Sequence, residues 1–243
     1  MNVLIVQHTQ SEGPGWWGEF LEESGARPTV VHPYLGDALS FNARDFSWLL
    51  CLGGPMNVYE EDLHPWLRGE NLFIQNWLRE GGAYLGVCLG AQLLTKAAGG
   101  RVVRSPQTEI GWGEVELNAR GIVDPLFEGV APQFPVLHWH GDMAQLPRDS
   151  EFGAATDLAF SSGCPIQSLR IGDKAYGVQF HVEVVAAMLE EWIAESTDYL
   201  AENPDAQPAR QMIEQARRTS DEARVLSRRV FDNFCKIAGQ PAA

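Results

Sequence analysis

Residues 84–94 read YLGVCLGAQLL: a short apolar run, a cysteine between two glycines, and then a segment of helical character. The apolar run predicts a buried strand over 84–87. The segment after the cysteine predicts a helix over 91–98, which the glycines at 99 and 100 end. A sharp turn from strand to helix requires small flanking residues, here Gly86 and Gly90. The stretch therefore predicts an α/β fold in which Cys88 stands at the end of a strand.

The segments on either side repeat this alternation of strand and helix. We expect strands over residues 2–6, 29–31, 48–52 and 175–181, and helices over 16–24, 67–79, 186–200 and 209–237. The middle, from about residue 101 to 174, is less helical and predicts strands at 115–117 and 134–139. This order is typical of a mostly parallel central sheet flanked by helices. We expect one α/β domain over residues 1–190, with a helical C-terminal extension over residues 191–243 packed on the same domain.

The composition of the 243 residues disfavours several classes of partner. A net charge of −14 argues against nucleic acid and anionic membranes, because phosphate binding requires a basic surface. No apolar stretch approaches the roughly 18 to 20 residues of a membrane span, and no basic segment precedes the first apolar run. The four cysteines are scattered without a C-x-x-C pair, which disfavours disulfides and a structural zinc site. We therefore expect a cytoplasmic protein.

Cys88 is the candidate nucleophile. At the predicted turn its sulfur faces the N-terminus of the following helix, whose positive end stabilises a thiolate. The backbone N–H of Leu89 is then free to face a developing oxyanion. The alternative is an inert buried cysteine, the interpretation that we give to Cys51, Cys164 and Cys235.

His181 and Glu183 supply a base and a carboxylate for Cys88. Residues two apart in a strand project from one face, so the two side chains are expected to meet, with Glu183 orienting the imidazole. Gly53 and Gly54 follow the predicted strand over 48–52, and a glycine pair permits a backbone N–H that faces into a cleft. Taken alone, each feature also fits an ordinary turn or strand end.

Together, these motifs resemble those of the class I glutamine amidotransferases. The segments GGPMN (53–57), GVCLGAQLL (86–94) and GVQFHVE (177–183) have the order and approximate spacing of that family, and HWHGD (138–142) is similar to a segment of its GMP-synthase-like branch. The resemblance covers roughly residues 1–190. It implies a flavodoxin-like fold and a Cys88-His181-Glu183 triad that hydrolyses the γ-amide of glutamine through a γ-glutamyl thioester.

The resemblance also implies roles for residues around the triad. Gly54 and Leu89 would donate the oxyanion-hole N–H groups, and the substrate would lie against Gln92, Gly53 and His140. Val182 stands where the family usually has proline; since valine suits a strand, we expect the triad to survive. About 60 residues follow Glu183, so we expect no synthetase domain in this chain.

Several alternatives remain open. His138, His140 and Asp142 have the donor types of a metal site, but the resemblance favours a structural or substrate-side role, and we expect no metal and no cofactor. Residues 107–112 either line the pocket through Glu109 and Trp112 or form a strand turn. The arginine-bearing stretch over 209–237 is a solvated or packing helix, or part of a homodimer interface.

Three functions fit these residues. The first is an amidotransferase that passes ammonia to a separate synthetase subunit. The second is a self-contained γ-glutamyl hydrolase or peptidase acting on another γ-glutamyl compound. The third is a catalytically silent binding protein, which an intact triad disfavours.

Overall fold

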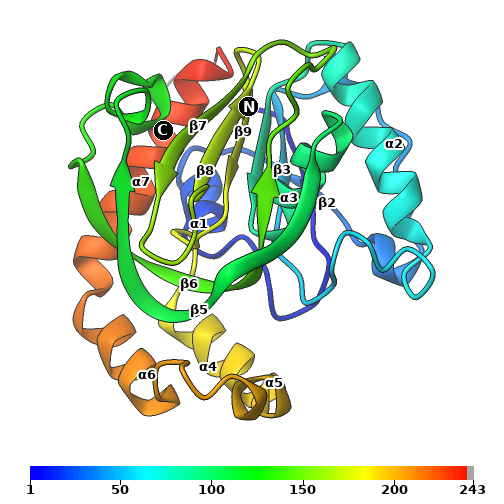
Figure 1. Cartoon of the computed structure of the whole chain (residues 1–243). Helices are drawn as coiled ribbons and strands as arrows, with labels where there is room; N and C mark the ends of the chain where they lie inside the picture. Colours follow the sequence, from blue (N-terminus) through cyan, green and yellow to red (C-terminus); the bar gives the residue numbers. More distant parts are fainter. Residues whose placement is uncertain (240–243) are drawn as a thin grey trace.

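Five short apolar strands form the parallel half of a nine-stranded sheet in the computed structural model, which describes residues 1–239 (Figure 1). In spatial order they are β2 (Thr29–Val31), β1 (Val3–Val6), β3 (Trp48–Cys51), β4 (Tyr84–Val87) and β9 (Ala175–Val178). Every residue of β1, β3, β4 and β9 is buried, as expected for parallel strands covered on both faces. The α/β class is confirmed.

Four antiparallel strands continue the sheet beyond β9. They are β8 (Ser168–Ile171), β7 (Ala155–Phe160), β5 (Arg101–Leu117) and β6 (Gln133–Gln145). β5 and β6 pair into a long curved hairpin, with a register shift between Arg104 and Glu109 (Figure 1). The strands expected over 115–117 and 134–139 lie within these two longer strands.

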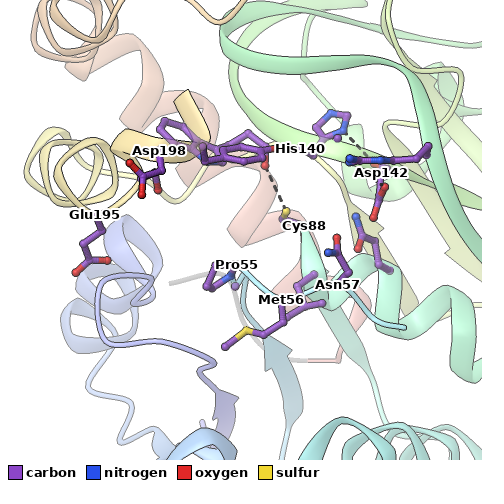
Figure 2. A pocket seen from close by; sticks show the side chains of 16 residues that line it. Pro55, Met56, Asn57, Cys88, His140, Asp142, Glu195 and Asp198 are labelled. Atoms are coloured by element: carbon purple, nitrogen blue, oxygen red, sulfur yellow. Dashed lines mark hydrogen bonds and ion pairs between the residues drawn. The ribbon is translucent and has the colours of Figure 1, made fainter. Parts of the chain in front are cut away.

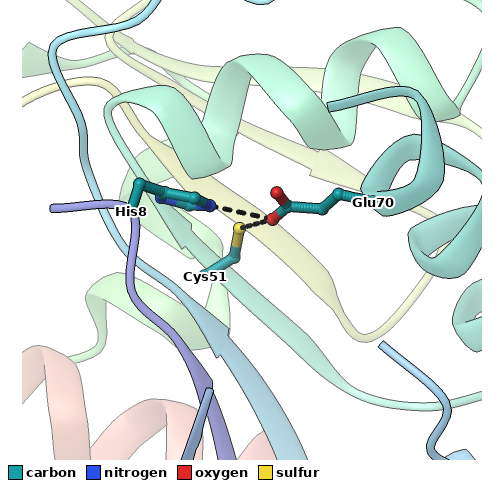
Figure 3. Close-up of side chains that lie close together, drawn as sticks. All are labelled: His8, Cys51 and Glu70. Carbon is teal, nitrogen blue, oxygen red and sulfur yellow. Dashed lines mark hydrogen bonds and ion pairs between the residues drawn. The ribbon is translucent and has the colours of Figure 1, made fainter. Parts of the chain in front are cut away.

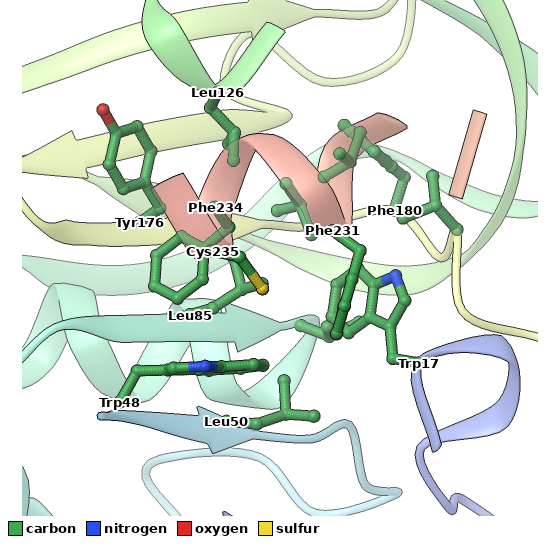
Figure 4. Packing of buried hydrophobic residues seen from close by; sticks show 14 of the residues in the cluster. Trp17, Trp48, Leu50, Leu85, Leu126, Tyr176, Phe180, Phe231, Phe234 and Cys235 are labelled. Carbon is green, nitrogen blue, oxygen red and sulfur yellow. The ribbon is translucent and has the colours of Figure 1, made fainter. Parts of the chain in front are cut away.

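Helices cover both faces of the sheet. On one face lie α1 (Gly15–Glu23) and α7 (Ser220–Ile237), whose Phe20, Phe231 and Phe234 join one core cluster. On the other face lie α2 (Trp66–Arg79) and α3 (Leu89–Ala97), which contribute to a second cluster. Figure 4 shows Phe231 and Phe234 of α7 packed beside the side chains of the parallel strands.

The C-terminal helices differ from their expected lengths. The helix expected over 186–200 is two, α4 (Ala186–Glu195) and α5 (Thr197–Glu202), and the one expected over 209–237 is also two, α6 (Ala209–Arg218) and α7. The breaks fall at Ser196 and Thr219, and the Thr219 hydroxyl donates to the Gln215 carbonyl at 3.0 Å. Such side-chain bonds compete with the helical pattern.

Four 3₁₀ turns complete the elements of residues 1–239: η1 (Pro33–Leu35), η2 (Ala43–Asp45), η3 (Gly121–Val123) and η4 (Pro125–Phe127). Among residues 1–239, no helix combines the length and the apolar character needed to cross a membrane.

Candidate active site

Cys88 occupies a strained turn between β4 and α3. Its φ is +48° and its ψ is −103°, and within residues 1–239 no other non-glycine residue has a positive φ. The flanking glycines are required by the backbone: a Cβ on Gly86 would lie 2.4 Å from the Gly90 carbonyl carbon, and one on Gly90 would lie 2.1 Å from the Cys51 carbonyl oxygen. Strain of this kind is typical of functional residues whose surroundings fix their conformation.

Two polar contacts of the Cys88 sulfur are long. The Gln179 amide donates to Sγ at 3.4 Å, and Sγ lies 3.8 Å from the Trp139 carbonyl oxygen. Gln179 is itself held by Gln92, whose amide donates to it at 3.1 Å. These two contacts orient the thiol.

His181 and Glu183 meet, but not as neighbours on one strand. β9 ends at Val178, so the strand expected over 175–181 is too long and the argument from strand periodicity is wrong. Beyond β9 the chain turns toward β6, and the His181 N–H donates to the Leu137 carbonyl at 2.9 Å. In this turn His181 Nδ1 lies 2.7 Å from Glu183 Oε1, and the Val182 N–H donates to the other carboxylate oxygen at 3.0 Å.

The surroundings of His181 favour its protonated form. Burial would lower the pKa of this imidazole, but the charge of Glu183 and hydrogen bonds with Cys88 and Glu183 outweigh it and raise the pKa well above the usual value. The Trp192 ring meets the imidazole edge-on, with centroids 4.8 Å apart. These contacts hold the imidazole beside the sulfur and favour its protonated form.

Two backbone N–H groups next to Cys88 have no protein acceptor within the described part of the chain, those of Gly54 and Leu89. Leu89 is the first residue of α3, where helical N–H groups are unpaired. A Cβ on Gly54 would lie 2.9 Å from Leu89 Cδ2, which shows how closely the two segments approach. Unpaired N–H groups in this arrangement are suited to stabilise an oxyanion.

A cavity of about 480 Å³ opens over Cys88 (Figure 2). The segments that line it come from the loop after β3, the start of α3, the β5–β6 hairpin and the α4–α5 junction. Its lining residues are Gly54, Pro55, Met56, Asn57, Cys88, Leu89, Gln92, Arg104, Trp139, His140, Gly141, Asp142, Glu195, Ser196, Asp198 and Tyr199. Arg104 and three carboxylates provide charges of both signs, which suits a zwitterionic ligand such as an amino acid.

A second cavity, of about 250 Å³, lies on the His181 side of the sulfur. It is lined by His181, Glu12, Trp192 and Glu195 among others. Burial and the nearby charge of Glu183 raise the pKa of Glu12 to about 7, against the opposing effects of the neighbouring imidazoles. This carboxyl group therefore changes charge near neutral pH.

The residues expected to bind substrate have different positions. Gln92 lines the larger cavity. His140 also lines it, but its Nδ1–H donates to the Asp142 carbonyl at 3.1 Å, and its Nε2 faces Gln167 at 3.2 Å. Gly53 lines neither cavity, and its carbonyl accepts from His8 at 3.0 Å.

Within residues 1–239, His138, His140 and Asp142 do not converge as one ligand set; His140 groups instead with Glu109 and Cys164. The Glu109 carboxylate accepts from the Ser161 hydroxyl at 2.8 Å and from the Gln167 amide at 2.7 Å, so it belongs to a hydrogen-bond network.

Several cavity residues carry no local signal in the sequence. Glu12 reaches the site from the loop between β1 and α1. Trp192, Glu195 and Tyr199 reach it from α4 and α5, which follow the last motif. Trp112, by contrast, packs beside α6, where its indole N–H donates to the Met212 carbonyl at 3.1 Å. For Trp112, the packing interpretation holds.

Comparisons with known proteins identify the family of this chain. The family model for class-I glutamine amidotransferases matches residues 19–195. The glutamine amidotransferase-like protein YfeJ of Salmonella typhimurium is 34% identical over 205 residues, covering 83% of this chain and 84% of that protein. The GMP synthase of Aeropyrum pernix is 39% identical over 164 residues, covering 68% of this chain but 29% of the synthase, so the chain spans less than a third of that relative.

Solved structures of glutamine amidotransferases have a similar fold. A glutamine amidotransferase from Thermotoga maritima matches with a TM-score of 0.85 at 30% identity, over 96% of this chain and 97% of that one. A glutamine amidotransferase from Methylobacillus flagellatus matches with a TM-score of 0.86 at 28% identity, over 97% of this chain and 94% of that one.

Proposed function

Because this chain belongs to the class I glutamine amidotransferase family, we propose that it hydrolyses the γ-amide of glutamine with Cys88 as nucleophile. The observation that carries the proposal is the convergence of three features on one sulfur. These are the strained turn at Cys88, the 2.7 Å contact between His181 and Glu183, and the cavity that opens over the thiol. No part of this reaction requires a metal or an organic cofactor.

The chemistry begins with the Cys88 thiolate and protonated His181. Sulfur attacks the γ-carbonyl carbon, and the oxyanion accepts hydrogen bonds from the N–H groups of Gly54 and Leu89. The C–N bond then breaks as His181 gives its proton to the leaving nitrogen, which departs as ammonia and leaves a γ-glutamyl thioester. Neutral His181 next removes a proton from water, which attacks the thioester and releases glutamate and the thiolate.

The direct test is turnover of glutamine by the native chain and by Cys88→Ala. We expect Cys88→Ala to release neither ammonia nor glutamate while keeping the native circular dichroism spectrum. Cys235→Ala is the matched control, since Cys235 lies on α7, is buried in the core and lines neither cavity. Glutaminase activity retained in Cys88→Ala contradicts the assignment.

Two uses of this chemistry follow from different observations. The similarity to GMP synthases supports delivery of ammonia to a separate synthetase subunit. The second cavity, next to the residue that protonates the leaving nitrogen, supports hydrolysis of γ-glutamyl amides with leaving groups larger than ammonia.

A substrate panel separates these two uses. Glutamine and γ-glutamyl amides of alkylamines are incubated with the protein, and glutamate release is measured. Faster turnover of the alkylamides than of glutamine favours the hydrolase. Turnover of glutamine alone favours the amidotransferase.

A further inference from the structure

A buried cluster behind the site holds one peptide bond next to Cys88. It consists of His8, Cys51 and Glu70, all with no exposed surface (Figure 3). The His8 Nδ1–H donates to the Gly53 carbonyl at 3.0 Å, and Glu70 Oε1 lies 2.9 Å from His8 Nε2. The Cys51 thiol donates to the same carboxylate oxygen at 3.3 Å. The chemistry proposed above uses none of these three side chains.

We propose that His8 is a positioning residue for the oxyanion hole: it fixes the Gly53–Gly54 peptide so that the Gly54 N–H faces the reacting carbonyl oxygen. The inference rests on the proposed function, because it assigns the Gly54 N–H to the oxyanion. It adds a residue that lies outside both cavities and acts only through the backbone.

The geometry of a trans peptide carries the argument. Its carbonyl oxygen and the N–H of the next residue point in opposite directions, and the described residues contain no cis peptide bond. When His8 holds the Gly53 carbonyl, the Gly54 N–H therefore points away from His8. Gly54 lines both cavities beside Cys88, and its N–H has no protein acceptor in residues 1–239.

The peptide between Gly53 and Gly54 needs the hydrogen bond from His8 because both residues are glycines. Two consecutive glycines lack the Cβ atoms that restrict the backbone, so the peptide between them can turn over at little steric cost. In the turned-over state a carbonyl oxygen replaces the N–H beside the sulfur, and its partial negative charge opposes an oxyanion. The hydrogen bond from His8 selects the other state.

The surroundings of His8 strengthen this hydrogen bond. Burial would lower the pKa of the imidazole, but the charge of Glu70 and hydrogen bonds with Cys51 and Glu70 outweigh it and raise the pKa well above the usual value. A protonated imidazole can donate from both nitrogens, and charged donors make the stronger hydrogen bonds. The Trp66 ring stacks on His8 with centroids 5.6 Å apart and fixes the plane of the ring.

A matched pair of substitutions tests the proposal. His8→Asn places an amide donor near the position of Nδ1 and can keep the bond to Gly53, whereas His8→Gln places it near Nε2 and can keep the bond to Glu70. Both bury one neutral amide, so they carry similar structural costs. We expect kcat for the best γ-glutamyl substrate to fall roughly tenfold to a hundredfold in His8→Gln, below the effect of deleting an oxyanion donor, and about threefold or less in His8→Asn.

Two further measurements separate positioning from general damage. Alkylation of Cys88 by iodoacetamide needs no oxyanion hole, so its rate stays within about twofold of native in both variants, and KM is likewise unchanged. In a crystal structure of His8→Gln we expect the Gly53 carbonyl to have turned or to be disordered. That structure tests the role of His8 even if Cys88→Ala shows that the proposed function is wrong.

Three results overturn the proposal. One is an equal loss of kcat in the two variants together with an equal loss of alkylation, which marks a structural role. Another is native kcat in His8→Gln with the peptide in its native orientation. The third is a stoichiometric metal ion in the purified protein that is lost in both variants, because the three side chains would then be metal ligands.

Discussion

The backbone strain at Cys88 destabilises the fold, and the same backbone conformation positions the sulfur. A non-glycine residue in such a conformation costs about 1–3 kcal/mol, whereas glycine adopts it freely. Cys88→Gly and Cys88→Ala both remove the thiol, but only the first removes the strain. We expect the free energy of unfolding in urea to be about 1 kcal/mol higher for Cys88→Gly than for Cys88→Ala. This value allows for the greater flexibility of glycine in the unfolded chain. Equal stability of the two variants would contradict the strain.

Glu183 controls the charge of His181, which predicts a dependence of stability on pH. The folded pKa of His181 is raised above the unfolded value of about 6.5. Its contribution to stability is therefore complete below that pH and is lost as the pH rises through the folded pKa. Glu183→Gln removes the contribution, so the loss of unfolding free energy in this variant is expected to be larger at about pH 6 than at about pH 9.5. Urea unfolding of the native chain and of Glu183→Gln at the two pH values measures this loss. A loss that does not depend on pH would refute the charge pairing of His181 with Glu183.

At the scale of elements, the sequence predicted the strands and helices that are determined by the residues within them. The strands expected over 48–52 and 84–87 agree with β3 and β4 within a residue, since a short apolar run bounded by turn residues is a local signal. The break between α6 and α7 and the turn that carries His181 were missed. The turn that carries His181 depends on a contact with a distant segment, the bond from its N–H to the Leu137 carbonyl. The break between α6 and α7 falls at Thr219, where the sequence has neither a glycine nor a proline to signal a helix end.

At the candidate site, too, the sequence did not predict every contact between distant segments. Sequence reasoning brought Cys88, His181 and Glu183 together, and the structure places them at one site, although by a turn rather than a strand. His8 could not be found, because its partner Gly53 lies 45 residues away and a lone histidine after a strand has no distinctive spacing.

The first turn of α3 and the interior of α2 each contain a glycine, and substitution of the two is predicted to have opposite effects. Gly90→Ala would place a Cβ 2.1 Å from the Cys51 carbonyl oxygen, so backbone must move and we expect a loss of about 3 kcal/mol or more. Gly69 lies inside α2 with open space around it, so Gly69→Ala is expected to stabilise by about 0.5–1 kcal/mol through helix propensity. Urea unfolding of the two variants measures both changes. A stable Gly90→Ala with native kinetics would show that the strand–helix contact tolerates a methyl group.

On the scale of the whole molecule, the C-terminal helix α7 is built into the main core. Its Phe234 packs against Trp48 of β3 with ring centroids 5.2 Å apart, and Arg228 lies over the Phe20 ring of α1 at 3.7 Å. The side chains of Arg224 and Arg228 also pair with Glu23 of α1. For the stretch over 209–237, the sequence left open a solvated or packing helix or part of a homodimer interface. Arg224 and Arg228 of this stretch tie the two helices on this face together.

This packing predicts that the C-terminal residues unfold with the sheet in one transition. Phe234→Ala empties a fully buried aromatic site and is expected to lower the unfolding free energy by about 3–5 kcal/mol. Val225→Ala, on an exposed position of the same helix, is the matched control and is expected to change it by less than about 0.5 kcal/mol. Unfolding followed by tryptophan fluorescence and by circular dichroism is expected to give one midpoint for both probes in each variant, shifted far lower only in Phe234→Ala. If the probes separate in Phe234→Ala, so that helix is lost while the tryptophans stay buried, α7 is instead an independent extension.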